Sequence, residues 1–79
     1  MTDSLYAIIR EMPYYRRLAI VMLIADITPK ELAYAIGLRP DSIYGYYNGA
    51  RVPSNKRRVE FAEVLGKKMP MLKKLILEE

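Results

Sequence analysis

The sequence contains no cysteine and no histidine. Their absence excludes disulfide bonds, metal sites built on thiolate or imidazole ligands, and any nucleophile activated by an imidazole. The nine acidic residues are scattered, and no two of them form an evident catalytic pair. A tyrosine nucleophile for DNA cleavage would also need supporting basic and histidine groups. We therefore expect no enzymatic activity, no cofactor, no metal ion and no small-molecule substrate.

Glutamine is also absent, and asparagine occurs only at Asn48 and Asn55. Because thermolabile residues are scarce in proteins from hot habitats, this composition hints at a thermophilic source. The longest apolar run, Leu18 to Ala25, is far shorter than the roughly 18 residues of a membrane-spanning helix. The polar N-terminus shows no secretory signal. We expect a cytoplasmic protein with no membrane partner.

The 79 residues begin with methionine and carry a net charge of +4, and 52% of them are hydrophobic. This length predicts a single domain over residues 1–79 with a thin core, so either the core is unusually dense or some apolar surface is covered by a partner. The positive charge favours either a polyanionic partner or merely a solvated basic face, and composition does not separate the two. Most of it falls between Arg51 and Lys74, where eight basic residues face only Glu60 and Glu63. These are Arg51, Lys56, Arg57, Arg58, Lys67, Lys68, Lys73 and Lys74.

Proline and glycine divide the chain into short apolar segments of helical periodicity, and no strand pattern persists. The sequence therefore predicts an all-α fold, a compact bundle of about five short helices with a helical extension at its N-terminus. We expect the extension over residues 1–12, a helix from Pro13 to about Asp26, a helix-turn-helix over 28–49, a helix from Ser54 that Gly66 stops, and a C-terminal helix over 70–79.

The segment from Thr28 to Gly49 has the signals of two helices joined by a tight turn. Thr28 and Glu31 form the pattern of a capping box, and the proline between them suits a first helical turn. Gly37 can take the left-handed conformation that ends a helix. A second short helix opens at Pro40 and ends at Gly49. Two helices joined in this way can form a DNA-binding helix-turn-helix.

The stretch ITPKELAYAIGLRPDSIYGYYNGARVPSNKRRVEFAEVLG resembles the Cro-type, lambda-repressor-like (XRE) helix-turn-helix family. Three positions depart from the family pattern. Arg39 replaces a small hydroxyl residue, Pro29 a glutamine, and Tyr47 a glutamate. The matching positions are Thr28, Glu31, Leu32, Ala33, Gly37, Ile43, Asn48, Gly49, Pro53, Ser54, Ala62, Leu65 and Gly66.

The resemblance implies that the outward residues early in the second helix meet base edges in the major groove. Arg39 could contact guanine with two hydrogen bonds, and Asp41 could accept from the cytosine amino group. Asp41 could instead only favour the helix N-terminus and orient Arg39. Ile43 and Tyr46 should face the core. The complete base-reading set is Arg39, Asp41, Ser42, Tyr44 and Gly45.

Residues around this helix are expected to contact phosphates, which set the register without reading sequence. Arg58 stands where the family has an apolar residue, so its stem should cover the core. Each charged residue also has an alternative role in solubility alone. Four of the seven tyrosines should be packing residues with solvated hydroxyls; these are Tyr6, Tyr14, Tyr15 and Tyr34. The phosphate-contacting set is Lys30, Tyr47, Asn48, Arg51, Lys56 and Arg57.

We therefore expect a homodimeric, sequence-specific transcriptional repressor that binds double-stranded DNA in the nucleoid. Its two half-sites should lie about 34–36 Å apart, one helical turn. The candidate dimer surfaces are the Leu18–Ala25 helix and the segments Leu5–Met12 and Pro70–Leu77. The alternatives are an antitoxin-like regulator with a protein partner, a purely structural helical bundle, and a basic C-terminal helix that binds a membrane surface.

Overall fold

A computed structural model describes residues 2–77, and within this range the chain forms helices and no strand. The expected all-α bundle is confirmed. The C-terminal helix expected over 70–79 is divided into a 3-10 turn and an α-helix, and its last two residues lie outside the described range. The elements are α1 (Thr2–Arg10), α2 (Tyr14–Ala25), α3 (Pro29–Ile36), α4 (Pro40–Tyr47), α5 (Asn55–Lys68), η1 (Pro70–Leu72) and α6 (Lys73–Leu77).

The joints between the helices follow from local chemistry. Pro13 separates α1 from α2 and is the N-cap residue of α2. Asp26 ends α2 in the left-handed region, with φ of 57°, a conformation that aspartate tolerates better than most residues. Gly37 ends α3 with φ of 74°, and the side chain of Ser54 accepts the backbone N–H of Arg57 at 3.2 Å to begin α5. The helix end expected at Gly37 and the helix start expected at Ser54 are confirmed.

The expectation that Gly66 stops the fifth helix is wrong, because α5 continues through it to Lys68. Gly66 is buried, and the side chain of Lys73 at the start of α6 crosses directly over it. A Cβ atom on Gly66 would lie only 2.5 Å from Cγ of Lys73. This glycine therefore allows two helices to approach closely instead of terminating one.

One continuous core holds the helices together. Phe61 of α5 is fully buried and meets the ring of Tyr46 edge-to-face, with 5.6 Å between ring centroids. Fully buried side chains come from α2 to α6, so each of these helices contributes to one interior. The largest are Phe61, Leu18, Met22, Leu32, Ile43, Leu65, Leu75, Ile76 and Val21.

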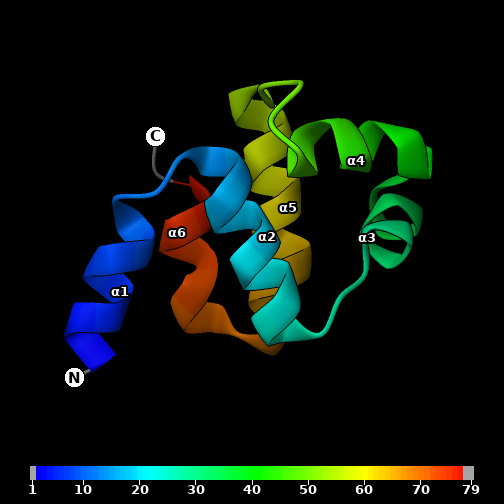
Figure 1. The fold of residues 1–79 in the computed structure, drawn as a ribbon. Helices are drawn as coiled ribbons and strands as arrows, with labels where there is room; N and C mark the ends of the chain where they lie inside the picture. The colour runs from blue at the N-terminus through cyan, green and yellow to red at the C-terminus, as the bar shows by residue number, and fades with distance from the viewer. Residues whose placement is uncertain (1, 78–79) are drawn as a thin grey trace.

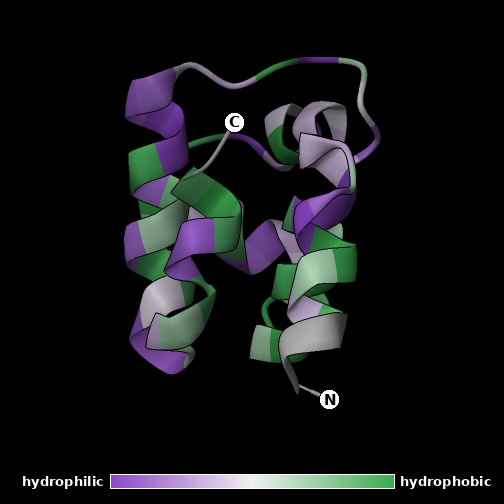
Figure 2. Ribbon diagram, turned by 90° about the vertical axis from the view of Figure 1, so that its left-hand side faces the viewer, coloured by the Kyte–Doolittle hydropathy of each residue, from purple (hydrophilic) through white to green (hydrophobic). Residues whose placement is uncertain are grey.

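The two ends of the molecule differ (Figure 1). Helices α3 and α4 form one end, where α3 is seen nearly end-on and α4 runs across the view, so the two cross steeply. Helix α1 lies at the other end, and Ile9 is its buried residue, whereas Leu5 and Ile8 are each 58% exposed. Figure 2 looks onto this second side and shows hydrophobic positions along α1. The bundle thus presents α4 at one end and uncovered apolar surface at the other.

Candidate nucleic-acid interface

The start of α3 is held by the expected capping box, which is confirmed. The backbone N–H of Glu31 donates to the Thr28 hydroxyl at 3.1 Å, and the backbone N–H of Thr28 donates to the Glu31 carboxylate at 3.0 Å. Pro29 occupies the first helical position, where a missing N–H costs nothing. The box fixes the first turn of α3, and Lys30 in that turn is exposed.

This capping box predicts an acid-dependent contribution to stability. The hydrogen bonds that the Glu31 carboxylate makes with Thr28, chiefly with its backbone N–H, hold the pKa of Glu31 below the usual value of 4.5. A group whose pKa is lower in the folded state stabilises the fold above its unfolded pKa, and this contribution is lost as pH falls through the folded pKa. Glu31→Gln should therefore lower the unfolding temperature at neutral pH, and the difference from the wild type should vanish in acid.

Thermal unfolding followed by circular dichroism at neutral and acidic pH measures this difference. Glu63→Gln removes an equally exposed carboxylate from outside the capping box and serves as the control. A deficit of Glu31→Gln that stayed constant across the acid range would contradict the expectation.

Helix α4 turns a polar face outward. On one face Arg39, Asp41 and Tyr44 are exposed, and Ser42 is half-buried. On the opposite face Ile43 and Tyr46 are buried. The prediction that Ile43 and Tyr46 face the core is confirmed. Arg39 is the N-cap residue of α4 but makes no side-chain capping hydrogen bond. Arg39 is thus exposed at the start of α4, and the acidic residue Asp41 lies in the first turn of the helix.

Gly45 lies beneath Arg51, which the sequence did not predict. A Cβ atom on Gly45 would lie 2.9 Å from Cδ of Arg51, and the Arg51 guanidinium lies over the Tyr46 ring, 5.2 Å from its centroid. The backbone N–H of Arg51 also donates to the Gly45 carbonyl at 3.0 Å. The space left by the missing side chain of Gly45 is therefore filled by Arg51. A group that approached Gly45 from the side where a Cβ atom would lie would meet the stem of Arg51.

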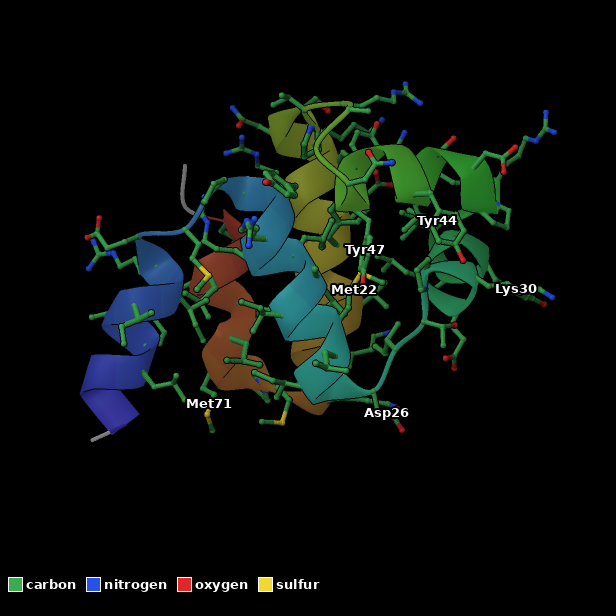
Figure 3. The ribbon with its side chains drawn as sticks, in the orientation of Figure 1. Met22, Asp26, Lys30, Tyr44, Tyr47 and Met71 are labelled. Atoms are coloured by element: carbon green, nitrogen blue, oxygen red, sulfur yellow. The ribbon has the colours of Figure 1, made fainter. Side chains whose placement is uncertain are left out.

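Tyr44 and Tyr47 lie edge-to-face on α4, with 6.5 Å between ring centroids. Figure 3 shows both projecting from α4, with Lys30 on neighbouring α3. Tyr47 also lines a mostly apolar pocket of about 200 Å³ together with Met22 and Asp26 of the α2 end. Tyr47 is only 38% exposed, so its ring packs against the bundle while part of it remains at the surface.

The turn after α4 is built by Asn48 and Gly49. The Asn48 side-chain carbonyl accepts the backbone N–H of Ala50 at 3.0 Å, and Gly49 has φ of 86°. The Tyr15 ring lies against Gly49, and its Cδ1 would be 3.0 Å from a Cβ atom there. The amide oxygen of Asn48 is thus engaged in the turn, and the residue as a whole is exposed.

The first turn of α5 places two predicted phosphate-contacting residues in different states. Lys56 is exposed. Arg57 is half-buried and forms an ion pair with Glu60, with 2.8 Å between Nη1 and Oε1. Because that carboxylate competes with a phosphate for the same donors, Lys56 is the more available of the two. The structure therefore brings Lys30, Arg39, Arg51 and Lys56 to the surface on and beside α3 and α4.

Three side chains behave differently from expectation. The hydroxyl of Tyr14, expected to be solvated, is buried. Tyr34 was expected to pack but is 79% exposed, on the outer face of α3 beside Lys30. Arg17 was assigned no role, yet it is 2% exposed. Its spacing from Val21 and Ala25, four residues each, places it on the buried stripe of α2, and this signal was present in the sequence. Arg58 is half-buried with its Nε and Nη1 atoms enclosed, as expected for a stem that covers the core.

The chain matches no known protein family, no curated protein and no solved structure with significant similarity. Among the helices of residues 2–77, none combines the length and apolar character needed to cross a bilayer. The case for a function therefore depends on the residues and geometry of the chain itself.

Proposed function

We propose that this protein is a sequence-specific, double-stranded DNA-binding regulator that inserts α4 into the major groove. The observation that carries the proposal is the two-sided character of α4. Ile43 and Tyr46 anchor the helix in the core, while Arg39, Asp41 and Tyr44 are exposed on the other side. A recognition helix needs this arrangement, since it must be rigidly mounted and still offer polar side chains to base edges.

The surroundings of α4 support the same proposal through charge. Lys30 at the start of α3, Arg51 after α4 and Lys56 at the start of α5 are exposed cations that come from three separate segments. The carboxylate of Glu31, the residue after Lys30, accepts a hydrogen bond from the backbone N–H of Thr28 in the capping box. A groove-reading helix flanked by cations on several elements suits a duplex, because phosphates lie on both sides of the major groove.

In vitro selection from random duplexes, followed by affinity measurements over a salt series, tests this proposal. We expect an enriched sequence and a slope of log K against log salt of about −3 to −4, since each neutralised phosphate contributes about −0.9. Binding that ignores sequence and disappears at moderate salt would instead favour a structural bundle with a basic surface. Absence of duplex binding would refute the proposal.

We further propose that the protein binds DNA as a homodimer and represses transcription by blocking polymerase. The support is the uncovered apolar surface on α1, the end of α2 and the C-terminal elements. Ile24 is 45% exposed and Met71 is 69% exposed. Ile24 and Met71 share an apolar groove of about 270 Å³ with Leu5 of α1. Exposed apolar surface of this kind marks a protein contact.

Introducing a charge on this surface should abolish the dimer. Ile24→Glu should give a monomer in light scattering and weaken binding to a two-half-site duplex, with little effect on a single half-site. Val52→Glu, at another apolar residue that is 80% exposed but lies in the α4–α5 loop, is the control for oligomeric state. A wild-type protein that is monomeric on DNA would contradict the homodimer and favour the antitoxin-like alternative, in which another protein covers the surface.

A further inference from the structure

A second cluster of cations lies away from the outer face of α4, around Tyr14 at the start of α2. The guanidinium carbon of Arg58, from α5, is 4.4 Å from the Tyr14 ring centroid, and that of Arg17, one helical turn beyond Tyr14, is 5.2 Å from it. Tyr14 therefore carries two positive groups that come from two different helices.

These groups lack the partners that buried polar atoms normally have. Within residues 2–77, the buried Nε and Nη1 atoms of Arg17 and Arg58 and the Tyr14 hydroxyl have no hydrogen-bond partner. The ring attracts the flat faces of the guanidinium groups, but it does not satisfy their in-plane N–H donors. A buried cation without a counter-charge destabilises the fold, and only 2% of the Arg17 surface is exposed.

Tyr14 does not supply the missing negative charge. Burial raises the pKa of its hydroxyl well above the usual value of 10.0, although Arg58 and Arg17 act in the opposite direction. The hydroxyl stays protonated near neutral pH and can donate a hydrogen bond. The cluster thus combines several donors and two positive charges, and no described carboxylate pairs with it.

We propose that Tyr14, Arg17 and Arg58 form a binding site for a phosphate-type oxyanion. Planar guanidinium groups bind phosphate oxygens through paired N–H donors, and a protonated tyrosine can add a third contact. Arg58 is only half-buried, so the cluster reaches the surface on its side. The second terminal nitrogen, Nη2, of each guanidinium group is not among the enclosed atoms, so an anion would reach the cluster there. An open pocket of about 190 Å³ lies next to the cluster on the other side of Tyr14; Gly49, Arg51 and Pro53 line it, and neither Arg17 nor Arg58 does.

The position of this pocket indicates two sources for the anion. The turn after α4, with Asn48 and Arg51, is the segment proposed above to contact DNA phosphates, so a backbone phosphate of the duplex could occupy the site. This source depends on the proposed function. Free inorganic phosphate has the same chemistry and needs no DNA.

Thermal unfolding of the full chain in sodium phosphate and in sodium chloride of equal ionic strength tests the site. The unfolding temperature of the wild type should rise by roughly 5–10 °C when phosphate is about tenfold above its dissociation constant. Arg58→Met should lose this rise while keeping its fold, because an apolar side chain of similar length can replace a buried cation. Arg57→Met removes the same charge from the adjacent, ion-paired position and should keep the rise.

The proposal is overturned if phosphate and chloride stabilise the wild type equally, or if Arg58→Met responds to phosphate as the wild type does. Arg17→Met should lose the phosphate response as Arg58→Met does. If Arg17→Met does not fold, the response of Arg58→Met decides whether the site exists. Glu78→Gln combined with Glu79→Gln tests whether the chain's own acids provide the counter-charge. If that double variant alone gained a response to phosphate, the anion site would be intramolecular and the proposal wrong.

DNA titration separates the two sources of the anion. If a backbone phosphate occupies the site, Arg58→Met should make the salt slope of duplex binding shallower by about 1. An unchanged slope together with a lost phosphate response assigns the site to a free anion. A wild type that responds to phosphate but binds no duplex would refute the proposed function and leave the anion site standing.

Discussion

Replacing Arg39 by alanine is expected to weaken binding to a selected duplex by roughly 5- to 150-fold, which corresponds to about 1–3 kcal/mol for one base-reading contact. Arg39 is exposed at the N-terminus of α4 and makes no capping hydrogen bond, so its loss should leave the helix itself intact. Preference should relax at one base-pair position while the other positions keep theirs.

Repeated selection with the variant and titration of single-base mutants of the duplex measure both effects. Lys56→Ala is the matched comparison, because a phosphate contact should weaken all sequences alike and make the salt slope shallower by about 1. Lys67→Ala, exposed near the far end of α5, should change neither. Arg39 has no base-reading role if Arg39→Ala leaves the affinity and the preference for the selected site intact.

Replacing Phe61 by alanine is expected to cost about 3–5 kcal/mol of the free energy of unfolding, the usual range for removing a fully buried phenylalanine. Phe61 has no exposed surface and packs edge-to-face on Tyr46, the residue that holds α4 to the core. A domain of this length has only roughly 4–12 kcal/mol of stability, so a large share would be lost. The reason is that a small residue at this fully buried position leaves a cavity that the surrounding side chains close only in part.

Urea unfolding followed by far-ultraviolet circular dichroism suits this protein, which has no tryptophan for fluorescence. Val59→Ala, two residues earlier in α5 and 44% exposed, is the control and should cost less than about 1 kcal/mol. A loss below that level for Phe61→Ala would contradict the expectation.

The four-residue patterns along the chain determined where α3 and α5 begin and where α3 ends, but not where α5 ends. The capping box of Thr28 and Glu31, the left-handed Gly37 and the Ser54 cap all involve atoms within a few residues of one another. Hydrogen bonds of this kind form without help from the rest of the fold. The same local periodicity placed Ile43 and Tyr46 on the inner face of α4.

Contacts between distant segments decided the rest. Arg51 covers Gly45, Lys73 crosses Gly66, and Arg58 meets Tyr14 forty-four positions away in the sequence, which no local pattern encodes. Tyr34 is exposed because no helix within residues 2–77 covers it on the outer face of α3, although its residue type favours burial. Helix ends thus follow from short-range backbone hydrogen bonding, whereas the surroundings of a side chain depend on which helices the core brings beside it.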